Sequence, residues 1–299
     1  MLESTTAVIV NYETPDYTIR AVRTLLDDGI PLERVVVVDN GSTDGSVERL
    51  QAELPGCRIE RLEDNVGYAR AGNRGAALLP GDAYLLVNSD AFVERPGSLQ
   101  VLVGALADPG VGIVVPRLLN EDRTLQPNAM PVTTPGVALV RASGLSRLIP
   151  NRWQTSWSTH WDHSTTQDIE SADGPVYLVR GALWDELEGY TEREYMYAED
   201  LDLCLRARRA GWRIRFVREA EFIHVGMGST TRWTSAERSE RIGRSEAAMI
   251  REHLSPLKAR LTLAFLGTGL AGRWLVYRLL GKRDAAASLR GSLRGYLGG

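Results

Sequence analysis

The sequence has little cysteine, no basic cluster interleaved with aromatic residues, and no long apolar run free of charge. With only Cys57 and Cys204 among 299 residues, the chain is not a disulfide-rich scaffold, and we expect both to be small buried residues in a reducing cytosol. The lack of a basic, aromatic patch in the first 255 residues argues against nucleic acid as a partner. Residues 1–6 lack the length and the cationic start of a secretory signal, so we expect a cytoplasmic protein.

The formal charge of −3 is unevenly distributed along the chain. Residues 256–299 hold eight basic residues and one acidic residue, a net charge of +7, so the first 255 residues carry −10. This asymmetry predicts that the basic tail meets an anionic membrane surface. The apolar stretch 261–280 contains Arg273 and Arg278, which are costly to bury in a bilayer, so we expect an interfacial helix, peripheral on the inner face of the cell membrane. A helix packed against the body is the alternative.

Strand-like and helix-like segments alternate over the first 120 residues. Apolar runs predict strands at 5–11, 34–40, 57–62, 83–90 and 110–116, and helical periodicity predicts helices from about 16, and at 42–54, 68–79 and 97–107. Further along we expect a strand and helix within 176–187, a helix at 198–212, strands at 213–217 and 220–225, and an amphipathic helix at 235–254. The alternation predicts an α/β fold with a mostly parallel sheet covered by helices.

Polar side chains stand at the ends of three predicted strands. Asn11 ends the first, Asp39 the second, and Asn88 to Asp90 the fourth. Because ligands of parallel sheets bind beyond the carboxyl ends of the strands, we expect these side chains to converge on one site. A carboxylate such as Asp90 at the end of a buried strand needs solvent, a partner or a cation.

Six segments resemble, in order, the motifs of inverting family-2 glycosyltransferases, with the rhamnosyltransferase-like branch the nearest. They are AVIVNYETP (7–15), VVVVDNGSTDGS (35–46), NVGYARAGNRGA (65–76), LLVNSDAFV (85–93), AEDLDLCLRARRAGW (198–212) and FIHVGMGST (222–230). The resemblance spans roughly residues 5–230 and implies the GT-A fold, a Rossmann-like sheet flanked by helices. It implies a glycosyltransferase domain over 1–255, with a nucleotide-sugar half at about 1–120, an acceptor half at about 121–255, and an amphipathic tail at 256–299.

The resemblance also implies which residues bind the nucleotide-sugar donor. Asp39 would accept the N3–H of a uracil or thymine ring, and Gly67 would allow the diphosphate to approach a helix start. The expected donor-binding residues are Asn11, Asp39, Asn65, Gly67, Arg70, Asn73, Asn88 and Ser89. The plainer alternatives are a helix-capping carboxylate at Asp39 and an ordinary loop-to-helix junction at 65–73.

A divalent cation is implied on the donor diphosphate, held by the family's Asp-x-Asp segment. Here Asn88 replaces the first aspartate, which leaves Asp90 as the metal-binding carboxylate, and His224 matches a position that supplies a second ligand. An imidazole beside a carboxylate suits Mn²⁺ better than Mg²⁺, and either ion is expected. A purely structural His224 is the alternative.

The acidic cluster near residue 200 resembles the family's acceptor site. The resemblance places the general base at Asp200, with Glu199 and Asp202 as acceptor-binding groups. Compensation of the helix dipole is the plainer interpretation of these carboxylates. Trp153, Trp157 and Trp161 recur every four residues, and Trp157 is expected in the wall of the acceptor site, with core packing as the alternative.

These inferences predict a metal-dependent inverting hexosyltransferase that acts in cell-wall or other envelope polysaccharide biosynthesis. By resemblance, the donor is dTDP-rhamnose or another dTDP- or UDP-linked sugar, and the acceptor is a polyprenyl-linked or growing glycan. Two other functions stay open: a sugar nucleotidyltransferase, although NYETPDY (11–17) is not the Gly-rich, basic loop that it would need, and a nucleotide-sugar-binding module without turnover.

Overall fold

The computed structural model describes residues 1–143, 161–192, 199–226 and 234–298. The chain divides into two compact units. The first comprises residues 1–129, 162–195 and 199–229, and the second comprises 130–161, 196–198 and 230–299. In this division the segment that starts at residue 230 groups with the tail, and the expected domain boundary at residue 255 stays a prediction.

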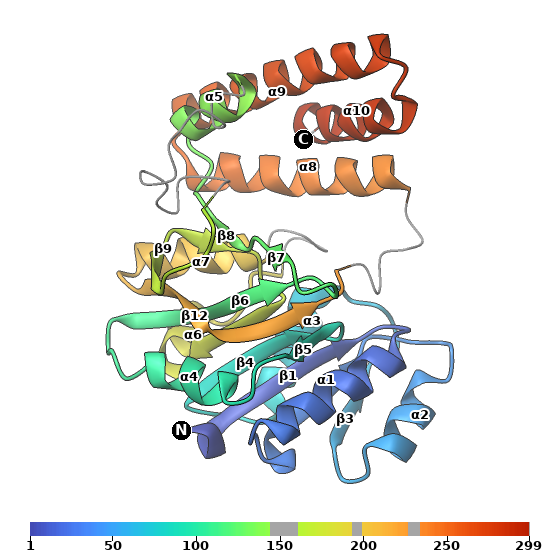
Figure 1. Cartoon of the computed structure of the whole chain (residues 1–299), viewed down its shortest axis with the longest axis vertical. Coiled ribbons are helices and arrows are strands. Elements are labelled where there is room, and N and C mark those ends of the chain that lie inside the picture. The colour runs from blue at the N-terminus through green and yellow to red at the C-terminus, as the bar shows by residue number, and fades with distance from the viewer. Residues whose placement is uncertain (144–160, 193–198, 227–233, 299) are drawn as a thin grey trace. The chain divides into compact units, whose positions relative to one another are not determined.

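A mixed sheet forms the centre of the first unit (Figure 1). In sheet order its strands are β3 (Arg58–Arg61), β2 (Val35–Asp39), β1 (Thr5–Asn11), β4 (Ala83–Asn88), β11 (Val176–Arg180), β6 (Val111–Leu119), β12 (Arg213–His224) and β5 (Ala91–Val93). The short strands β7 (Leu125–Gln126) and β9 (Gln167–Ile169) pair with β6 and β12. Two further two-residue strands are β8 (Ala129–Met130) and β10 (Ser171–Ala172).

Helices cover both faces of this sheet. They are α1 (Pro15–Asp27), α2 (Ser46–Glu53), α3 (Tyr68–Leu78), α4 (Ser98–Ala105), α6 (Gly181–Leu187) and α7 (Glu199–Arg209), with 3₁₀ turns η1 (Leu2–Ser4) and η2 (Leu32–Arg34). One core joins α1, α2 and α4 to side chains such as Ile9, Val37 and Leu85. Because side chains alternate along a strand, Val8 and Tyr84 point to the opposite face, where they meet α3 and Trp184 of α6.

The predicted strands and helices of the first 120 residues are all present, within a few residues of the predicted ends. Pairs β1–β2, β1–β4 and β2–β3 are parallel, as the alternation predicted. However, β11 lies antiparallel between β4 and β6, and β5 is antiparallel to β12. The two strands expected at 213–217 and 220–225 form one strand, β12, whose pairing with β6 shifts register between Val217 and Glu221.

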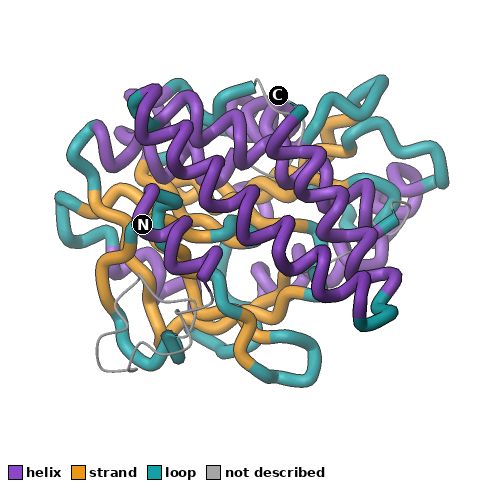
Figure 2. Tube along the Cα trace, turned by 90° about the horizontal axis from the view of Figure 1, so that it is seen from above, coloured by secondary structure: helices purple, strands orange, loops and turns teal. Residues whose placement is uncertain are grey.

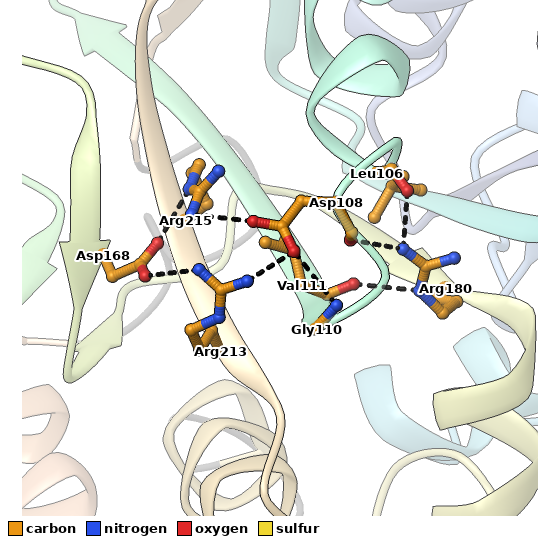
Figure 3. A network of polar contacts seen from close by, with 8 residues as sticks. All are labelled: Leu106, Asp108, Gly110, Val111, Asp168, Arg180, Arg213 and Arg215. Carbon is orange, nitrogen blue, oxygen red and sulfur yellow. Dashed lines mark hydrogen bonds and ion pairs between the residues drawn. The ribbon is translucent and has the colours of Figure 1, made fainter.

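An ion-pair network joins the amino-terminal ends of β6 and β12, at the sheet edge opposite the carboxyl ends of β1 and β4 (Figure 3). Arg213 donates to Asp108 and, over 3.0 Å, to Asp168, and Arg215 Nε donates to Asp168 Oδ1 over 2.7 Å. Nearby, Arg180 donates to the main-chain carbonyls of Leu106, Asp108 and Val111 (Figure 3). These contacts fasten three separate chain segments at the edge away from the polar strand ends.

The second unit is built mainly of helices (Figures 1 and 2). They are α5 (Pro135–Ser143), α8 (Ser235–His253), α9 (Pro256–Leu279) and α10 (Arg283–Leu297). A capping box between Thr234 and Glu237 starts α8, and a small core of its own includes Ala138, Ile250 and Leu266. Among the helices within the described ranges, none is long and apolar enough to cross a membrane.

Candidate active site

The polar ends of three parallel strands meet at one edge of the sheet. In the β1–β2 pair Asn11 is opposite Asp39, and in the β1–β4 pair Val10 is opposite Asn88. The expected convergence of these strand ends is therefore confirmed. Ser89 follows directly, and its hydroxyl accepts a hydrogen bond from Thr14 over 3.0 Å, which ties the β4 end to the start of α1.

Asp39 is fully buried and its carboxylate is held in a fixed orientation. Asn11 Nδ2 donates to Oδ2 over 2.7 Å, and the main-chain N–H of Ser42 donates to Oδ1 over 3.0 Å. Thr18 in turn donates to Asn11 Oδ1 over 2.7 Å, which fixes the amide of Asn11. A carboxylate has about four lone-pair sites, so Asp39 keeps acceptor capacity for a ligand N–H.

The loop before α3 is shaped by a pair of asparagines. Asn40 Nδ2 donates to Asn65 Oδ1 over 3.1 Å, and Asn65 Oδ1 also accepts from the N–H of Gly67. A Cβ at Gly41 would lie 2.5 Å from the main chain of Asp64, so only glycine lets these two loops touch. These bonds fix the loop that leads into α3 and engage the N–H groups of Val66 and Gly67, so binding of an anion there stays a prediction.

Arg70 and Asn73 of α3 face residues 190–192. Asn73 exchanges two hydrogen bonds of 2.9 Å with the main chain of Tyr190, and its amide also donates to Glu192. Arg70 is exposed and lies 3.5 Å from the carboxylate of Glu192. Asn73 thus positions α3 against a distant segment, and contact of either residue with a sugar nucleotide stays a prediction.

Asp90 and His224 lie together at the end of the sheet. Asp90 is 6% exposed; its Oδ2 accepts from the N–H of Gly226 over 3.1 Å, and its Oδ1 lies 3.5 Å from His224 Nε2. His224 Nδ1 lies 2.7 Å from Gln126 Oε1, and Gln126 Nε2 donates to Asn120 Oδ1 and to the carbonyl of His224. Both contacts of Gln126 Nε2 are with acceptors, so Gln126 Oε1 is the atom that faces the histidine. Gln126 Oε1 therefore accepts a hydrogen bond from the N–H at His224 Nδ1. His224 Nε2 therefore turns toward Asp90.

This geometry fits a divalent cation between an imidazole and a carboxylate. Two ligand atoms at about 2.1 Å from one ion lie roughly 3.0–3.5 Å apart, which matches the distance from His224 Nε2 to Asp90 Oδ1. A second hydrogen bond that fixes the tautomer of a ligating histidine, as Gln126 provides, is typical of metal sites. Within the described ranges, no three His, Cys, Asp or Glu side chains group as a metal site.

Asp200 is the second residue of α7 and lies partly buried. The N–H groups of Gly174 and Leu201 donate to its two oxygens over 2.8 Å and 2.7 Å. Burial raises the pKa of Asp200, and this effect outweighs the opposite effect of the main-chain hydrogen bonds. A carboxyl group with a raised pKa is a better proton acceptor near neutral pH than an ordinary aspartate.

The other two acidic residues of this cluster differ in their surroundings. Asp202 is buried, and its Oδ2 accepts from Arg206 Nε and from the Thr191 hydroxyl, each over 2.6 Å. This internal role was not predicted, and contact of Asp202 with an acceptor sugar stays a prediction. Glu199 begins α7 and is partly exposed. Trp157 lies outside the described residues, and Trp161 is buried.

Sequence reasoning missed Tyr68, the first residue of α3. Burial raises the pKa of its hydroxyl, and the negative charges of Glu199, Asp200 and Asp90 raise it further. The tyrosine therefore lies among the carboxylates of the site and keeps its proton as a hydrogen-bond donor. Its signal was the motif NVGYARAGN itself, whose aromatic residue stands directly after Gly67. Gln126 was also missed, since it lies 98 residues before the histidine that it orients.

The structure resembles those of solved glycosyltransferases. It aligns with a mannosyltransferase of Pyrobaculum calidifontis in complex with GDP-Man and Mn²⁺, with a TM-score of 0.60 and 17% identity, over 98% of this chain and 84% of the other. It also aligns with S. aureus TarS 1–349 in complex with UDP-GlcNAc, with a TM-score of 0.57 and 17% identity, over 98% and 81% of the two chains. At these identities the likeness shows the GT-A fold.

Sequence comparison places the chain in a family. A relative in Mycobacterium tuberculosis, N-acetylglucosaminyl-diphospho-decaprenol L-rhamnosyltransferase, is 28% identical over 278 residues, which cover 88% of this chain and 80% of the relative. The low-salt glycan biosynthesis hexosyltransferase Agl10 of Haloferax volcanii is 23% identical over 99% of this chain and 92% of the relative. The family model for glycosyl transferase family 2 matches residues 6–159, more than half of the chain. The chain belongs to glycosyl transferase family 2 and is a glycosyltransferase with a nucleotide-sugar donor.

Proposed function

We propose that this enzyme transfers rhamnose from dTDP-rhamnose, with inversion, to a polyprenyl-diphosphate-linked glycan of the cell envelope. The observation that carries the proposal is that the first unit holds both an Asp90–His224 pair at the polar sheet edge and Asp200 with a raised pKa. The choice of sugar and acceptor is supported by the mycobacterial relative, whose name specifies rhamnose and a diphospho-decaprenol acceptor.

In the proposed reaction an acceptor hydroxyl attacks the anomeric carbon from the face opposite the nucleotide. Asp200 takes the hydroxyl proton, a new C–O bond forms, and the bond to the diphosphate oxygen breaks with its electron pair leaving on the nucleoside diphosphate. Asp39 would accept the N3–H of the base. Tyr68, which keeps its proton, would donate a hydrogen bond near the reacting groups.

Asp90 and His224 would hold Mn²⁺ or Mg²⁺, with Gln126 fixing the histidine. When bound, such an ion offsets the negative charge that develops on the departing diphosphate. The basic, apolar tail would bring the enzyme to the inner face of the membrane that carries its acceptor.

A donor panel tests the proposal. Purified protein is incubated with dTDP-rhamnose, UDP- and GDP-linked sugars and a short-chain polyprenyl diphosphate GlcNAc, with Mn²⁺, with Mg²⁺ or with chelator. We expect rhamnosyl transfer that needs the metal, and a product whose anomeric configuration, read by NMR, is inverted. Retention of configuration would exclude the mechanism. Donor binding without turnover would identify a binding module, and sugar-nucleotide synthesis from a nucleoside triphosphate would identify a nucleotidyltransferase.

A further inference from the structure

A cavity of about 710 Å³ lies within the second unit, between α8, α9 and α10. None of its lining residues is a residue of the candidate active site, because each of them belongs to the helical unit. Its charged lining residues are Glu237, Glu240, Arg278, Arg283, Arg290 and Arg294. Its volume lies in the range of about 300–1,000 Å³ that small-molecule sites occupy.

The arginines reach the cavity because of their spacing on α10. Arg283, Arg290 and Arg294 are separated by seven and four residues, which places them on one helix face. Small residues on the same face let α10 approach α8 closely: a Cβ at Gly291 would lie 2.2 Å from the carbonyl oxygen of Ala236. The cavity is therefore lined by small residues and by arginines.

The cavity has an excess of positive charge. Four arginines line it against two glutamates, and both glutamates are engaged: Glu237 accepts hydrogen bonds from Thr234, and Glu240 pairs with Arg244 over 3.2 Å. Within the described residues, Arg283, Arg290 and Arg294 form no ion pair. Guanidinium groups grouped in this way match the geometry of phosphate oxygens, which they bind in a bidentate manner.

Exposed leucines lie at the C-terminal end of α9 and directly after it. Leu275, Leu279 and Leu280 are 51%, 78% and 63% exposed, and they alternate in sequence with the cavity residues Arg278 and Gly281. A free phosphate needs no such neighbours. The headgroup phosphate of a lipid does, because its acyl chains need apolar contacts next to the charged site.

We propose that this cavity, which we call the arginine pocket, binds the phosphate headgroup of an anionic phospholipid while the leucines of α9 enter the acyl region. The inference rests on the membrane association within the proposed function and adds a defined site to it. The arginine pocket would then orient the helical unit on the bilayer, which unspecific attraction by the basic tail would not do.

Matched double variants of the full-length chain test the pocket. R290Q/R294Q removes two charges from it, and K258Q/R260Q removes two charges from exposed positions of α9 outside it. Sedimentation is measured with vesicles that contain phosphatidylglycerol and with neutral phosphatidylcholine vesicles. We expect R290Q/R294Q to lose at least tenfold more affinity for the anionic vesicles than K258Q/R260Q, with unchanged unfolding midpoints. R290K/R294K keeps the charge and should still bind several-fold more weakly than wild type.

Three outcomes would overturn the inference. Equal losses in the two glutamine variants would mean that only the total charge matters. Full vesicle binding by R290K/R294K would mean that the guanidinium geometry is irrelevant. Stabilisation of wild type by inorganic phosphate alone, abolished in R290Q/R294Q, would assign the pocket to a free anion. Transfer to the short-chain acceptor should be unchanged in all variants, so failure of the pocket and failure of the proposed reaction are distinguishable.

Discussion

Asp200 is positioned by main-chain groups, since N–H groups of Gly174 and Leu201 each hold one of its oxygens. This arrangement fixes the side chain, and among the residues that the structure describes Asp200 forms no ion pair that would reduce its affinity for protons. Burial raises its pKa, so it accepts a proton more readily than an exposed aspartate.

Replacing Asp200 with asparagine should leave donor binding intact and lower the transfer rate by about 100-fold or more, because the amide cannot accept the acceptor proton. In wild type, kcat/KM should fall as the pH drops through the raised pKa, at a pH above about 3.9, the ordinary value for aspartate. Rates from pH 4 to 8 test this. Asp185→Asn removes an exposed carboxylate of α6 and serves as control. Transfer by the Asp200 variant within threefold of wild type would exclude it as the base.

Replacing Gln126 with methionine should weaken Mn²⁺ binding by about 10- to 100-fold, since the imidazole of His224 loses the acceptor that fixes its tautomer. Calorimetric titration of Mn²⁺ with donor present measures the change. Gln100→Met on the exposed side of α4 is the matched control. If both variants bind Mn²⁺ like wild type, the hydrogen bond between His224 and Gln126 does not contribute to metal binding.

The sequence predicted the main carboxylates of the site but not the partners of several other side chains. Asp39, Asp90 and Asp200 were predicted from strand ends and motifs, and the structure places each in a polar environment of the first unit. The partners of Asp202 and Asn73 could not be predicted. An ion pair to Arg206 uses local helix spacing but depends on burial, and the bonds from Asn73 to Tyr190 join positions 117 residues apart.

At the scale of elements, the ion pairs of Asp108 and Asp168 join β9, β12 and the loop before β6 (Figure 3). The hydrogen bond from Arg213 lowers the pKa of Asp108. Partial burial acts to raise the pKa of Asp168, but the hydrogen bonds from Arg215 and Arg213 outweigh it and the pKa is lowered. Depressed carboxylate pKa values contribute stability above the ordinary pKa of aspartate, and that stability is lost as the pH falls through the folded-state value.

Asp168→Asn should therefore destabilise the protein by about 1 kcal/mol at pH 7 and low salt, since two partly exposed ion pairs are lost. The difference from wild type should shrink in high salt, and it should shrink as the pH falls below the ordinary aspartate pKa and through the lowered folded-state value, where the Asp168 carboxylate takes up a proton. Urea unfolding at pH 7, pH 5 and pH 3 measures the free energy of unfolding. Asp185→Asn, which removes one exposed carboxylate, is the control for the loss of charge. A difference that persists unchanged at pH 3 would mean that packing, rather than charge, is responsible.

Element types were predictable, whereas their pairing was less so. Apolar runs bounded by turn residues predicted β1 to β4, because both signals lie within or next to each strand in the sequence. The position of β11 was not predicted, since nothing in VYLVR states that it lies antiparallel between β4 and β6. The unbroken course of β12 was missed because Arg218 and Glu219 look like a turn in sequence, while the structure absorbs them as an irregularity of one strand.

For the whole molecule, the contrast between the two units follows from composition. The first unit buries strands rich in valine and leucine in a large core. Its strands could therefore be predicted from apolar runs in the sequence. The second unit has a small core of its own and leaves several leucines of α9 and α10 exposed, so its amphipathic pattern predicted helices but not their partners. Whether residues 256–299 associate with a membrane stays a prediction, and the arginine pocket gives it a defined test.

The insertion of β11 beside β4 has a consequence for how the nascent chain matures. The edge of β4 stays unpaired until residues 176–180 have been synthesised, almost ninety residues after β4 ends. At roughly 5–20 residues per second, the ribosome leaves that apolar edge without its neighbour for several seconds or longer. Exposed strand edges invite pairing with other chains, so we expect chaperones to engage the nascent enzyme in this interval. Its yield in cells should then depend on translation speed between β4 and β11.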